Sequence, residues 1–173
     1  AVKNLNSNTN YTTPNEFNIG YGDNPTYPNM YESATLVVGA SILAANQIYS
    51  GKYSSIFNIA GGLHHAMPNN ASGFCIFNDP VIAIKTLLDL GLKVAYIDID
   101  CHHGDGVQQA FYDTDRVLTI SIHESGKYLF PGTGFTSEIG TGNGKGYSVN
   151  IPLHPYTGDD IYLEAFKTIV PRI

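Results

Sequence analysis

Apolar residues along the chain recur with a helical spacing in some segments and form short continuous runs in others. Between Tyr31 and Tyr49 small apolar residues recur every three or four positions, which predicts a helix. Residues 79–90 repeat this spacing, and Asp79 before a proline suits the N-cap of a second helix. Between these segments, residues 55–60 form a short apolar run that ends at two glycines, which predicts a buried strand.

The second half of the chain alternates in the same way. Residues 93–99, 117–122 and 147–151 are rich in apolar and β-branched side chains, which predicts three strands. The pattern Thr157-x-x-Asp160 resembles a capping box and predicts the start of a last helix. Strands that alternate with helices indicate a parallel sheet with helices on both faces. Residues 1–20 show no such period, and we expect them to be irregular.

The densest polar motif directly follows the strand predicted at 93–99. On an extended backbone Asp98, Asp100 and His102 would face one way, and Cys101 and His103 the other. Two carboxylates on one face of a buried strand repel each other, so we expect a positive group between them. An Asp-x-His pair offers zinc one oxygen and one nitrogen ligand. The alternative is a structural ion-pair cluster at the end of a core strand.

Polar clusters follow three of the predicted strands, those at residues 55–60, 93–99 and 117–122. His64 and His65 come after residues 55–60, and His123 comes after residues 117–122. Ligand sites of parallel sheets form at the carboxyl ends of the strands, which predicts one site at this edge. The glycine-dense run 140–146 is unlike a phosphate loop, because glycine follows its lysine and a strand, not a helix, comes next.

Composition narrows the class of protein. A net charge of −6 without any block of basic residues argues against nucleic acid as the main partner. No stretch is apolar for long enough to predict a membrane span, and the chain starts with no signal-peptide pattern. Cys75 and Cys101 are too few for a disulfide framework, so we expect reduced thiols and a cytoplasmic protein.

Six ordered motifs resemble the zinc-dependent histone deacetylase family, and most of all its prokaryotic branch of acetoin-utilisation proteins and acetylpolyamine amidohydrolases. The motifs are Gly61-Gly62-Leu63-His64-His65-Ala66, Ala71-Ser72-Gly73-Phe74-Cys75, Asn78-Asp79, the run from Tyr96 to Val107, Ser121-Ile122-His123, and Phe130-Pro131-Gly132-Thr133-Gly134. The resemblance extends from about Tyr21 to Ile173. It implies the three-layer αβα fold of the arginase and deacetylase type, with a mainly parallel sheet.

The resemblance also implies an activity and a metal. Members of the family remove acetyl or other acyl groups from lysine side chains or from acetylated small amines. Asp100 and His102 match two of the three protein ligands of a catalytic Zn²⁺. Fe²⁺ or Co²⁺ can use the same ligands.

The tandem histidines match the reacting centre of the family. His65 matches the residue that acts as general base, and His64 matches a residue with a mainly electrostatic role. By the same resemblance Asp98 pairs with His64, and Asp105 pairs with His65. Each imidazole needs a carboxylate to fix its tautomer and raise its basicity.

Further family positions concern the substrate and monovalent cations. The tube for the acyl-lysine chain and its rim match Asp23, Gly73, Phe74 and Phe130. Aromatic side chains suit a long aliphatic stem, although core packing is an alternative for Phe74. Two structural sites for K⁺ or Na⁺ match one set formed by Asp98, Asp100, His102, Ser121 and Ile122, and another formed by Phe111, Thr114, Val117 and Tyr147.

Three positions depart from related patterns. Leu63 stands where many eukaryotic members have tryptophan, which favours the prokaryotic branch. Cys101 occupies a variable position, and we expect it to be inert. Gly104 breaks the Asp-x-His-x-Asp pattern with which arginase-like enzymes bind two manganese ions, so we expect a single metal.

The length of the chain sets a limit on this interpretation. The family's third zinc ligand, an aspartate, and its oxyanion-stabilising tyrosine lie downstream of the position that matches Ile173. Two ligands hold zinc weakly. We therefore expect residues 1–173 to be the N-terminal portion of one deacetylase domain, incomplete at the C-terminus, inactive alone and partnered by the missing portion. An incomplete sheet should leave an apolar edge or face exposed. The alternative function is a catalytically incomplete module that binds an acyl ligand or a partner.

Overall fold

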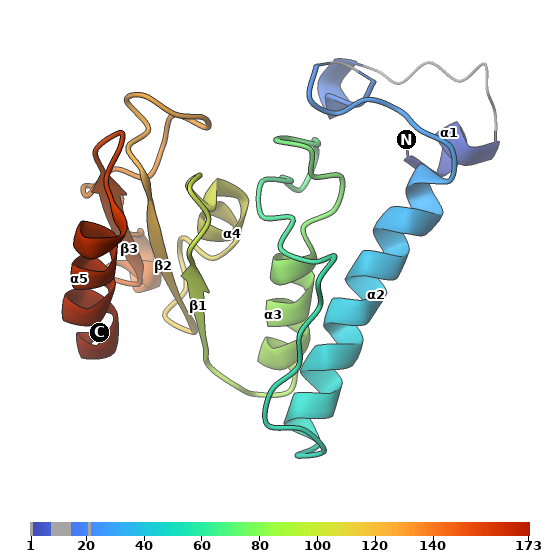
Figure 1. Cartoon of the computed structure of the whole chain (residues 1–173). Coiled ribbons are helices and arrows are strands. Elements are labelled where there is room, and N and C mark those ends of the chain that lie inside the picture. Colours follow the sequence, from blue (N-terminus) through green and yellow to red (C-terminus); the bar gives the residue numbers. More distant parts are fainter. Residues whose placement is uncertain (1, 8–14, 21) are drawn as a thin grey trace. The chain divides into compact units, whose positions relative to one another are not determined.

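The computed structural model describes residues 2–7, 15–20 and 22–173. The chain forms two compact units, residues 1–92 and residues 93–173, which are described here one at a time (Figure 1). Tyr21, where the family resemblance begins, lies outside the described residues, as does part of the segment expected to be irregular.

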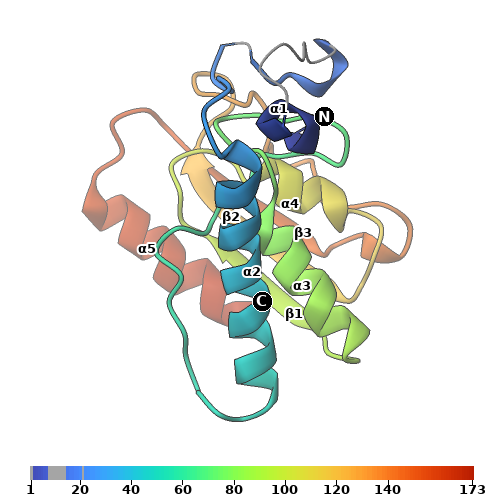
Figure 2. The same cartoon turned by 90° about the vertical axis from the view of Figure 1, so that its right-hand side faces the viewer.

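The first unit is built on two long helices. Helices α2 (Met30–Tyr49) and α3 (Asp79–Asp89) confirm the two predicted helices, and they lie side by side in both views (Figures 1 and 2). Helix α2 buries Ala34, Ser41 and Ala45, which share one face of the helix. These side chains are small, so they let the two helices approach closely.

The segment expected to be irregular contains two short helical pieces. They are α1 (Val2–Ser7) and the 3₁₀ helix η1 (Asn15–Phe17). Val2 joins Ile19, Met30 and Ala71 in a small apolar cluster. The prediction of an irregular segment missed these pieces because the apolar contacts that order them come from residues distant in sequence.

The strand predicted at residues 55–60 is wrong. The described part of the first unit contains no strand, and this stretch runs without regular structure. Phe57 and Ile59 are each 86% exposed. A strand requires a neighbouring strand to satisfy its backbone groups, and no such neighbour lies in the described part of this unit.

The predicted cap of α3 is also wrong by one residue. Asn78, not Asp79, is the N-cap, and its side-chain oxygen accepts a hydrogen bond from the Val81 N–H at 3.0 Å. A cap of this kind stabilises a helix by about 1 kcal/mol. Asp79 is thereby free to turn its carboxylate toward a neighbouring loop.

The second unit contains a three-stranded parallel sheet in the order β1-β2-β3 (Figure 1). The strands are β1 (Val94–Asp98), β2 (Val117–Glu124) and β3 (Ser148–Leu153), which confirms the three strands predicted here. Strand β2 is central and almost wholly buried, as its β-branched residues predict. Asp98 at the end of β1 pairs in register with Ser121 of β2, so polar residues begin at the same level.

Helices and turns complete the second unit. They are α4 (Asp105–Ala110), η2 (Gly142–Gly144), α5 (Asp159–Ile169) and η3 (Val170–Arg172). The predicted capping box is wrong, because α5 begins after Gly158 without a side-chain cap. The hydroxyl of Thr157 donates instead to the His154 carbonyl at 2.7 Å.

The expected exposure of apolar surface is confirmed in both units. In the second unit Ile97 on β1 is 43% exposed and Ile99 just after it 66% exposed. Helix α5 has no buried residue and exposes Ile161 and Leu163. Among the described residues no helix combines the length and the apolar character needed to cross a membrane.

Candidate functional site

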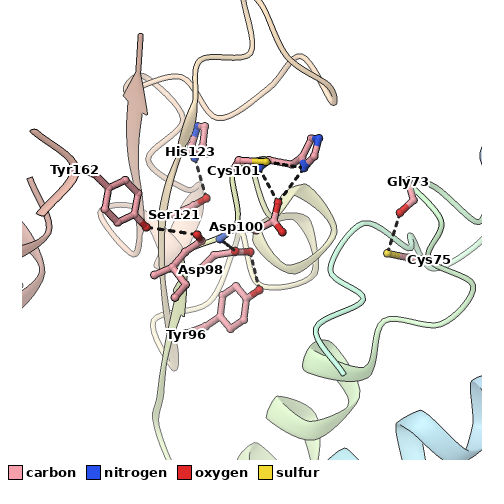
Figure 3. A network of polar contacts seen from close by, with 11 residues as sticks. Gly73, Cys75, Tyr96, Asp98, Asp100, Cys101, Ser121, His123 and Tyr162 are labelled. Carbon is pink, nitrogen blue, oxygen red and sulfur yellow. Dashed lines mark hydrogen bonds and ion pairs between the residues drawn. The ribbon is translucent and has the colours of Figure 1, made fainter. Parts of the chain in front are cut away.

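The polar motif of the second unit lies on a bend, not on the strand itself. Strand β1 ends at Asp98, and the chain turns at residues 100–102 before α4 begins. The predicted alternation of side chains is therefore wrong beyond Asp98, because the extended backbone does not persist. The bend brings the side chains of Asp100, Cys101 and His102 together. Figure 3 labels Asp100 and Cys101 on this bend.

These three side chains offer one oxygen, one sulfur and one nitrogen within 4.8 Å of one another. The Nδ1 atom of His102 lies 2.9 Å from Oδ1 of Asp100 and 3.3 Å from Sγ of Cys101. Oxygen, sulfur and nitrogen are the donors that Zn²⁺ prefers, and these distances suit atoms that share one small cation. The residues present therefore fit a divalent metal, and Asp100 and His102 are brought together as predicted.

The contact of Cys101 with both candidate ligands is a feature that sequence reasoning missed. Desolvation, and then the Asp100 carboxylate, raise the pKa of the Cys101 thiol. The thiol is therefore protonated at neutral pH. A cysteine between two candidate ligands was the available signal, but an ideal strand would have turned it away from them.

Asp98 is buried just beneath this bend and braces it. Its carboxylate accepts hydrogen bonds from the Tyr96 hydroxyl at 2.7 Å and from the Asp100 N–H at 3.0 Å. Tyr162 of α5 reaches the same loop, where its hydroxyl donates to the Ile99 carbonyl at 3.4 Å (Figure 3). Burial, and then the charges of Asp98 and Asp100, raise the pKa of the Tyr162 phenol, so it stays a donor.

The tandem histidines lie in the first unit and are both buried. His64 is 6% exposed and His65 is 4% exposed, and their ring centroids are 4.0 Å apart. The side-chain amide of Asn78 donates to the carbonyls of His64 at 3.0 Å and of Ala66 at 3.1 Å. The residue that caps α3 therefore also fixes the backbone on both sides of His65.

Asp79 holds the same loop from its other side. Its carboxylate accepts hydrogen bonds from the backbone N–H of Gly62 at 3.0 Å and of Leu63 at 2.9 Å. The hydroxyl of Ser41 in α2 donates to it at 2.6 Å. A Cβ atom at Gly61 would lie 2.6 Å from Oδ2 of Asp79, so any larger residue there would push this carboxylate out of place. Sequence reasoning interpreted Asp79 as a cap and missed this role.

The predicted substrate residues of the first unit lie at its surface. Asp23 is exposed, and Gly73 has a positive φ of 49°. Phe74 is 73% exposed, so the alternative that it packs in the core is wrong. Its φ of 67° is rare for an aromatic residue. Gly73 also accepts a hydrogen bond at its carbonyl from the Cys75 thiol at 3.3 Å (Figure 3).

Phe130 is the predicted substrate residue of the second unit. It lies on the loop between β2 and β3 and is 43% exposed. Its ring meets that of His102 edge-on, with centroids 6.2 Å apart and an interplanar angle of 67°. The structure thus brings one predicted substrate residue next to one predicted metal ligand.

The residues predicted to bind monovalent cations all lie in the second unit. Ser121 forms a hydrogen bond of 2.8 Å with Nδ1 of His123, and the Tyr147 carbonyl accepts from the Thr119 N–H at 2.9 Å. The side chains of the others are mostly buried, and their cation-binding roles remain predictions. Residues Phe111, Val117 and Ile122 are buried, and Thr114 accepts from the Arg116 N–H.

Two predicted pairs join residues of different units. These are Asp98 with His64 and Asp105 with His65, and they remain predictions. Within its own unit Asp105 opens α4 and accepts the N–H of Gly106 at 2.9 Å.

Comparison with known proteins identifies a family profile over the whole chain and relatives over most of it. The profile of the histone deacetylase domain matches residues 1–173. The acetoin utilization protein AcuC of Bacillus subtilis is 48% identical over 158 residues, which cover 91% of this chain and 41% of that protein. Histone deacetylase clr6 of Schizosaccharomyces pombe is 47% identical over 158 residues and is covered to 38%. The chain thus spans about two fifths of the length of these relatives.

Solved structures agree with the sequence comparison. A histone deacetylase homologue from Aquifex aeolicus has a TM-score of 0.85 and 42% identity, over 91% of this chain and 43% of that one. A homologue in complex with SAHA also has a TM-score of 0.85, over 90% of this chain and 42% of that one. This likeness confirms the predicted fold class, an α/β deacetylase fold with an incomplete sheet. The chain belongs to the histone deacetylase family.

Proposed function

We propose that this protein is a zinc-dependent deacylase that hydrolyses the amide of acetylated lysine side chains or acetylated small amines. The observation that carries the proposal is the meeting of Asp100 and His102 on the bend after β1, with Oδ1 and Nδ1 2.9 Å apart. Both side chains are partly open to solvent, at 51% and 36% exposure. An ion can therefore reach them without any opening of the core.

Asp100 and His102 would hold the metal as two of its protein ligands. When bound, a divalent ion supplies a Lewis acid that polarises the amide carbonyl and makes a water molecule more acidic. Asp98 keeps the bend in place, because it accepts the backbone N–H of Asp100 at 3.0 Å. The third ligand and the oxyanion-stabilising tyrosine of the family have no counterpart that we can assign in residues 1–173.

Proton transfer would fall to the tandem histidines. His65 would accept the proton of the attacking water and return it to the leaving amine, and His64 would act mainly through its charge. Their backbone is fixed by Asn78 and Asp79, which suits groups that must keep one orientation. Asp98 and Asp105 would fix the tautomers of the two imidazoles.

The acyl-lysine stem would lie between aromatic side chains. Phe74 and Phe130 both expose ring surface, at 73% and 43% exposure, which leaves them available to an aliphatic chain. Gly73 would leave room beside the stem, and Asp23 at the rim would accept hydrogen bonds from the substrate backbone. Structural K⁺ or Na⁺ ions would offset the negative charge of Asp98 and Asp100.

A complementary stretch of polypeptide is the proposed partner. The exposed side chains of Phe57, Ile59 and Ile99 are unusual for a domain that stands alone. The part of the family domain that lies outside the match would cover such surface and supply the missing ligand. We also propose a cytoplasmic location, since Cys75 and Cys101 are both free thiols.

The test is hydrolysis of an acetyl-lysine reporter by the longest form of the protein that its host produces. We expect zinc-dependent hydrolysis, with a loss of at least about a hundredfold in Asp100→Ala and in His65→Ala. Asp89→Ala, an exposed aspartate at the end of α3, is the matched control. Full activity in either site variant would refute the proposal. Zinc binding without any hydrolysis would favour the alternative, a module that only binds an acyl ligand or partner.

A further inference from the structure

A second group of polar side chains lies in the second unit, on the buried side of the bend. His103 follows His102 in the chain but is only 1% exposed. Its Nδ1 atom lies 2.8 Å from the Thr133 hydroxyl, and its Nε2 atom lies 3.2 Å from Oε1 of Gln108. The two adjacent histidines therefore have different surroundings. His102 belongs to the candidate metal site, whereas His103 contacts the loop between β2 and β3.

The hydrogen bonds of this group fix where the protons lie. The carboxylate of Glu138 only accepts, so the amide nitrogen of Gln108 donates to it at 2.7 Å. The oxygen of Gln108 therefore faces His103, and His103 must donate from Nε2. Its Nδ1 then accepts the hydroxyl proton of Thr133.

Glu138 is the acceptor to which the loop is attached. Its second oxygen accepts the backbone N–H of Gly134 at 2.9 Å and of Phe135 at 3.0 Å. Burial raises the pKa of Glu138, but the hydrogen bonds from Phe135, Gln108 and Gly134 outweigh it, and the pKa lies below its ordinary value. Glu138 is therefore ionised and forms charge-assisted bonds, which are stronger than neutral ones.

The loop is also held from the sheet. His123 of β2 contacts the Gly134 carbonyl at 2.9 Å through Nε2, so the ring donates from that atom. Asn150 of β3 donates to Oε1 of Gln108 at 2.7 Å and to the Glu138 carbonyl at 3.0 Å. Both backbone groups of Gly134 are thus bonded, four residues after Phe130.

We propose that Glu138 is a positioning residue, which acts with Gln108 and His103 to hold the ring of Phe130 against His102. The 6.2 Å edge-on contact of these two rings is the arrangement that the buried group maintains. The assignment of Phe130 to the acyl stem rests on the proposed function, whereas the anchoring of the loop does not. By this inference Glu138, Gln108 and His103, which lie outside the metal site, influence the binding of the acyl chain.

The first test uses the chain itself, which contains no tryptophan. Phe130→Trp introduces a single fluorescent reporter at the end of the loop. In that background Glu138→Gln keeps the shape but cannot accept all three hydrogen bonds, so we expect lower tryptophan anisotropy and red-shifted emission. Cleavage by trypsin after the exposed Lys127 should become roughly tenfold faster, the factor for the loss of about one net hydrogen bond. Glu164→Gln, an exposed glutamate of α5, is the control and should change neither quantity.

The outcomes separate anchoring from function. Unchanged anisotropy and cleavage in Glu138→Gln would overturn the proposal. Where that variant does not fold, Thr133→Val removes only the hydroxyl that contacts His103, and unchanged anisotropy in this variant would overturn it equally.

The second test measures acyl-lysine hydrolysis in the longest native form. We expect Glu138→Gln to raise KM about tenfold with a smaller change in kcat, because the stem loses its aromatic wall while the chemistry is untouched. Equal values for Glu138→Gln and wild type would show that the loop is anchored without positioning Phe130 for substrate. Absence of hydrolysis in every form would refute the deacylase proposal and leave the anisotropy result to decide the anchoring.

Discussion

Each unit uses a carboxylate to hold the backbone of a loop that carries proposed site residues. In the first unit Asp79 accepts the N–H groups of Gly62 and Leu63, just before the tandem histidines. In the second unit Glu138 accepts the N–H groups of Gly134 and Phe135, just after Phe130. In both cases the backbone is fixed by an acid that is not one of the residues proposed to bind the metal or transfer protons.

The two carboxylates differ in depth and in the partners that reach them. Asp79 is 2% exposed and is bonded from α2 through the buried Ser41, so its removal leaves that hydroxyl without an acceptor inside the unit. Glu138 is only half-buried, and its side-chain partner, Gln108, is itself held by other polar groups. The difference teaches that the histidine loop is held by two adjacent residues, Asn78 and Asp79, whereas the Phe130 loop depends on a wider network of polar side chains.

Removal of Asp79 should have the largest effect. In Asp79→Ala the Gly62 and Leu63 N–H groups and the Ser41 hydroxyl lose their acceptor, which should cost about 3–5 kcal/mol in free energy of unfolding. Urea denaturation followed by circular dichroism measures this loss. Asp89→Ala, at the exposed end of the same helix, should stay within about 0.5 kcal/mol of wild type. Equal losses in the two variants would contradict the anchoring role.

A methyl group at Gly134 tests how closely the second loop is packed. Its Cβ would lie 2.3 Å from Nε2 of His123 and 2.6 Å from the His103 ring, at a positive φ of 85°. Gly134→Ala should cost about 3 kcal/mol, from overpacking together with backbone strain. Gly142→Ala shares a positive φ, of 53°, but meets nothing within 4 Å, so it should cost only about 1 kcal/mol. Thermal unfolding of both variants measures the two losses of stability. Equal losses would mean that the loop around Gly134 can shift to accommodate a methyl group.

Asn78 links the cap of α3 to the histidine loop, so its effect should be intermediate. Asn78→Ala loses one cap bond and two bonds to the carbonyls of His64 and Ala66, which should cost about 2 kcal/mol. Asn78→Asp keeps the cap but cannot donate to the carbonyls. Recovery of about half the loss in Asn78→Asp is expected from unfolding measurements. Complete recovery would show that the amide contributes nothing to the loop.

The pH dependence of stability should be the smallest effect, and it concerns the second unit. Burial lowers the pKa of His123 below its ordinary value of 6.5. Below that pH the imidazole is protonated more readily in the unfolded chain than in the folded chain, which favours unfolding. The pKa of Glu138 also lies below its ordinary value of 4.5, with the same sign. Stability should therefore fall as pH drops below 6.5 and fall further below 4.5.

This pH dependence can be assigned by substitution. Glu138→Gln should remove part of the loss at the acid end, whereas Glu164→Gln should leave the whole profile unchanged. Denaturation at a series of pH values measures it. A profile that is flat from neutral pH down to the acid end would contradict the burial of His123 as an uncharged ring.

The sequence predicted those elements whose pattern is strong within one segment. Helices α2 and α3 and strands β1, β2 and β3 all follow from apolar periodicity and β-branched runs. The apolar pattern of residues 55–60 was not enough to predict a strand correctly. An apolar run forms a strand only where a second strand pairs with it. In the described first unit this partner is lacking.

The candidate site divides in the same way. Asp100 with His102, and His64 with His65, follow from adjacency in the motifs, and the structure keeps each pair together. Asp79 bonds to Ser41 and to Gly62, and Glu138 bonds to Gln108, and a local pattern does not encode such contacts between distant segments. An extended backbone would have placed Cys101 and His102 on opposite faces. The turn after Asp98 instead places Cys101 Sγ near the His102 ring.

Zinc titration of this chain, followed by calorimetry, tests the central claim most directly, since the proposed chemistry requires one ion between Asp100 and His102. We predict one weak site per chain that is lost in Asp100→Ala and in His102→Ala, and retained in His154→Ala, which removes an exposed histidine elsewhere in the same unit. Zinc binding that survives both of the first two substitutions would contradict the account.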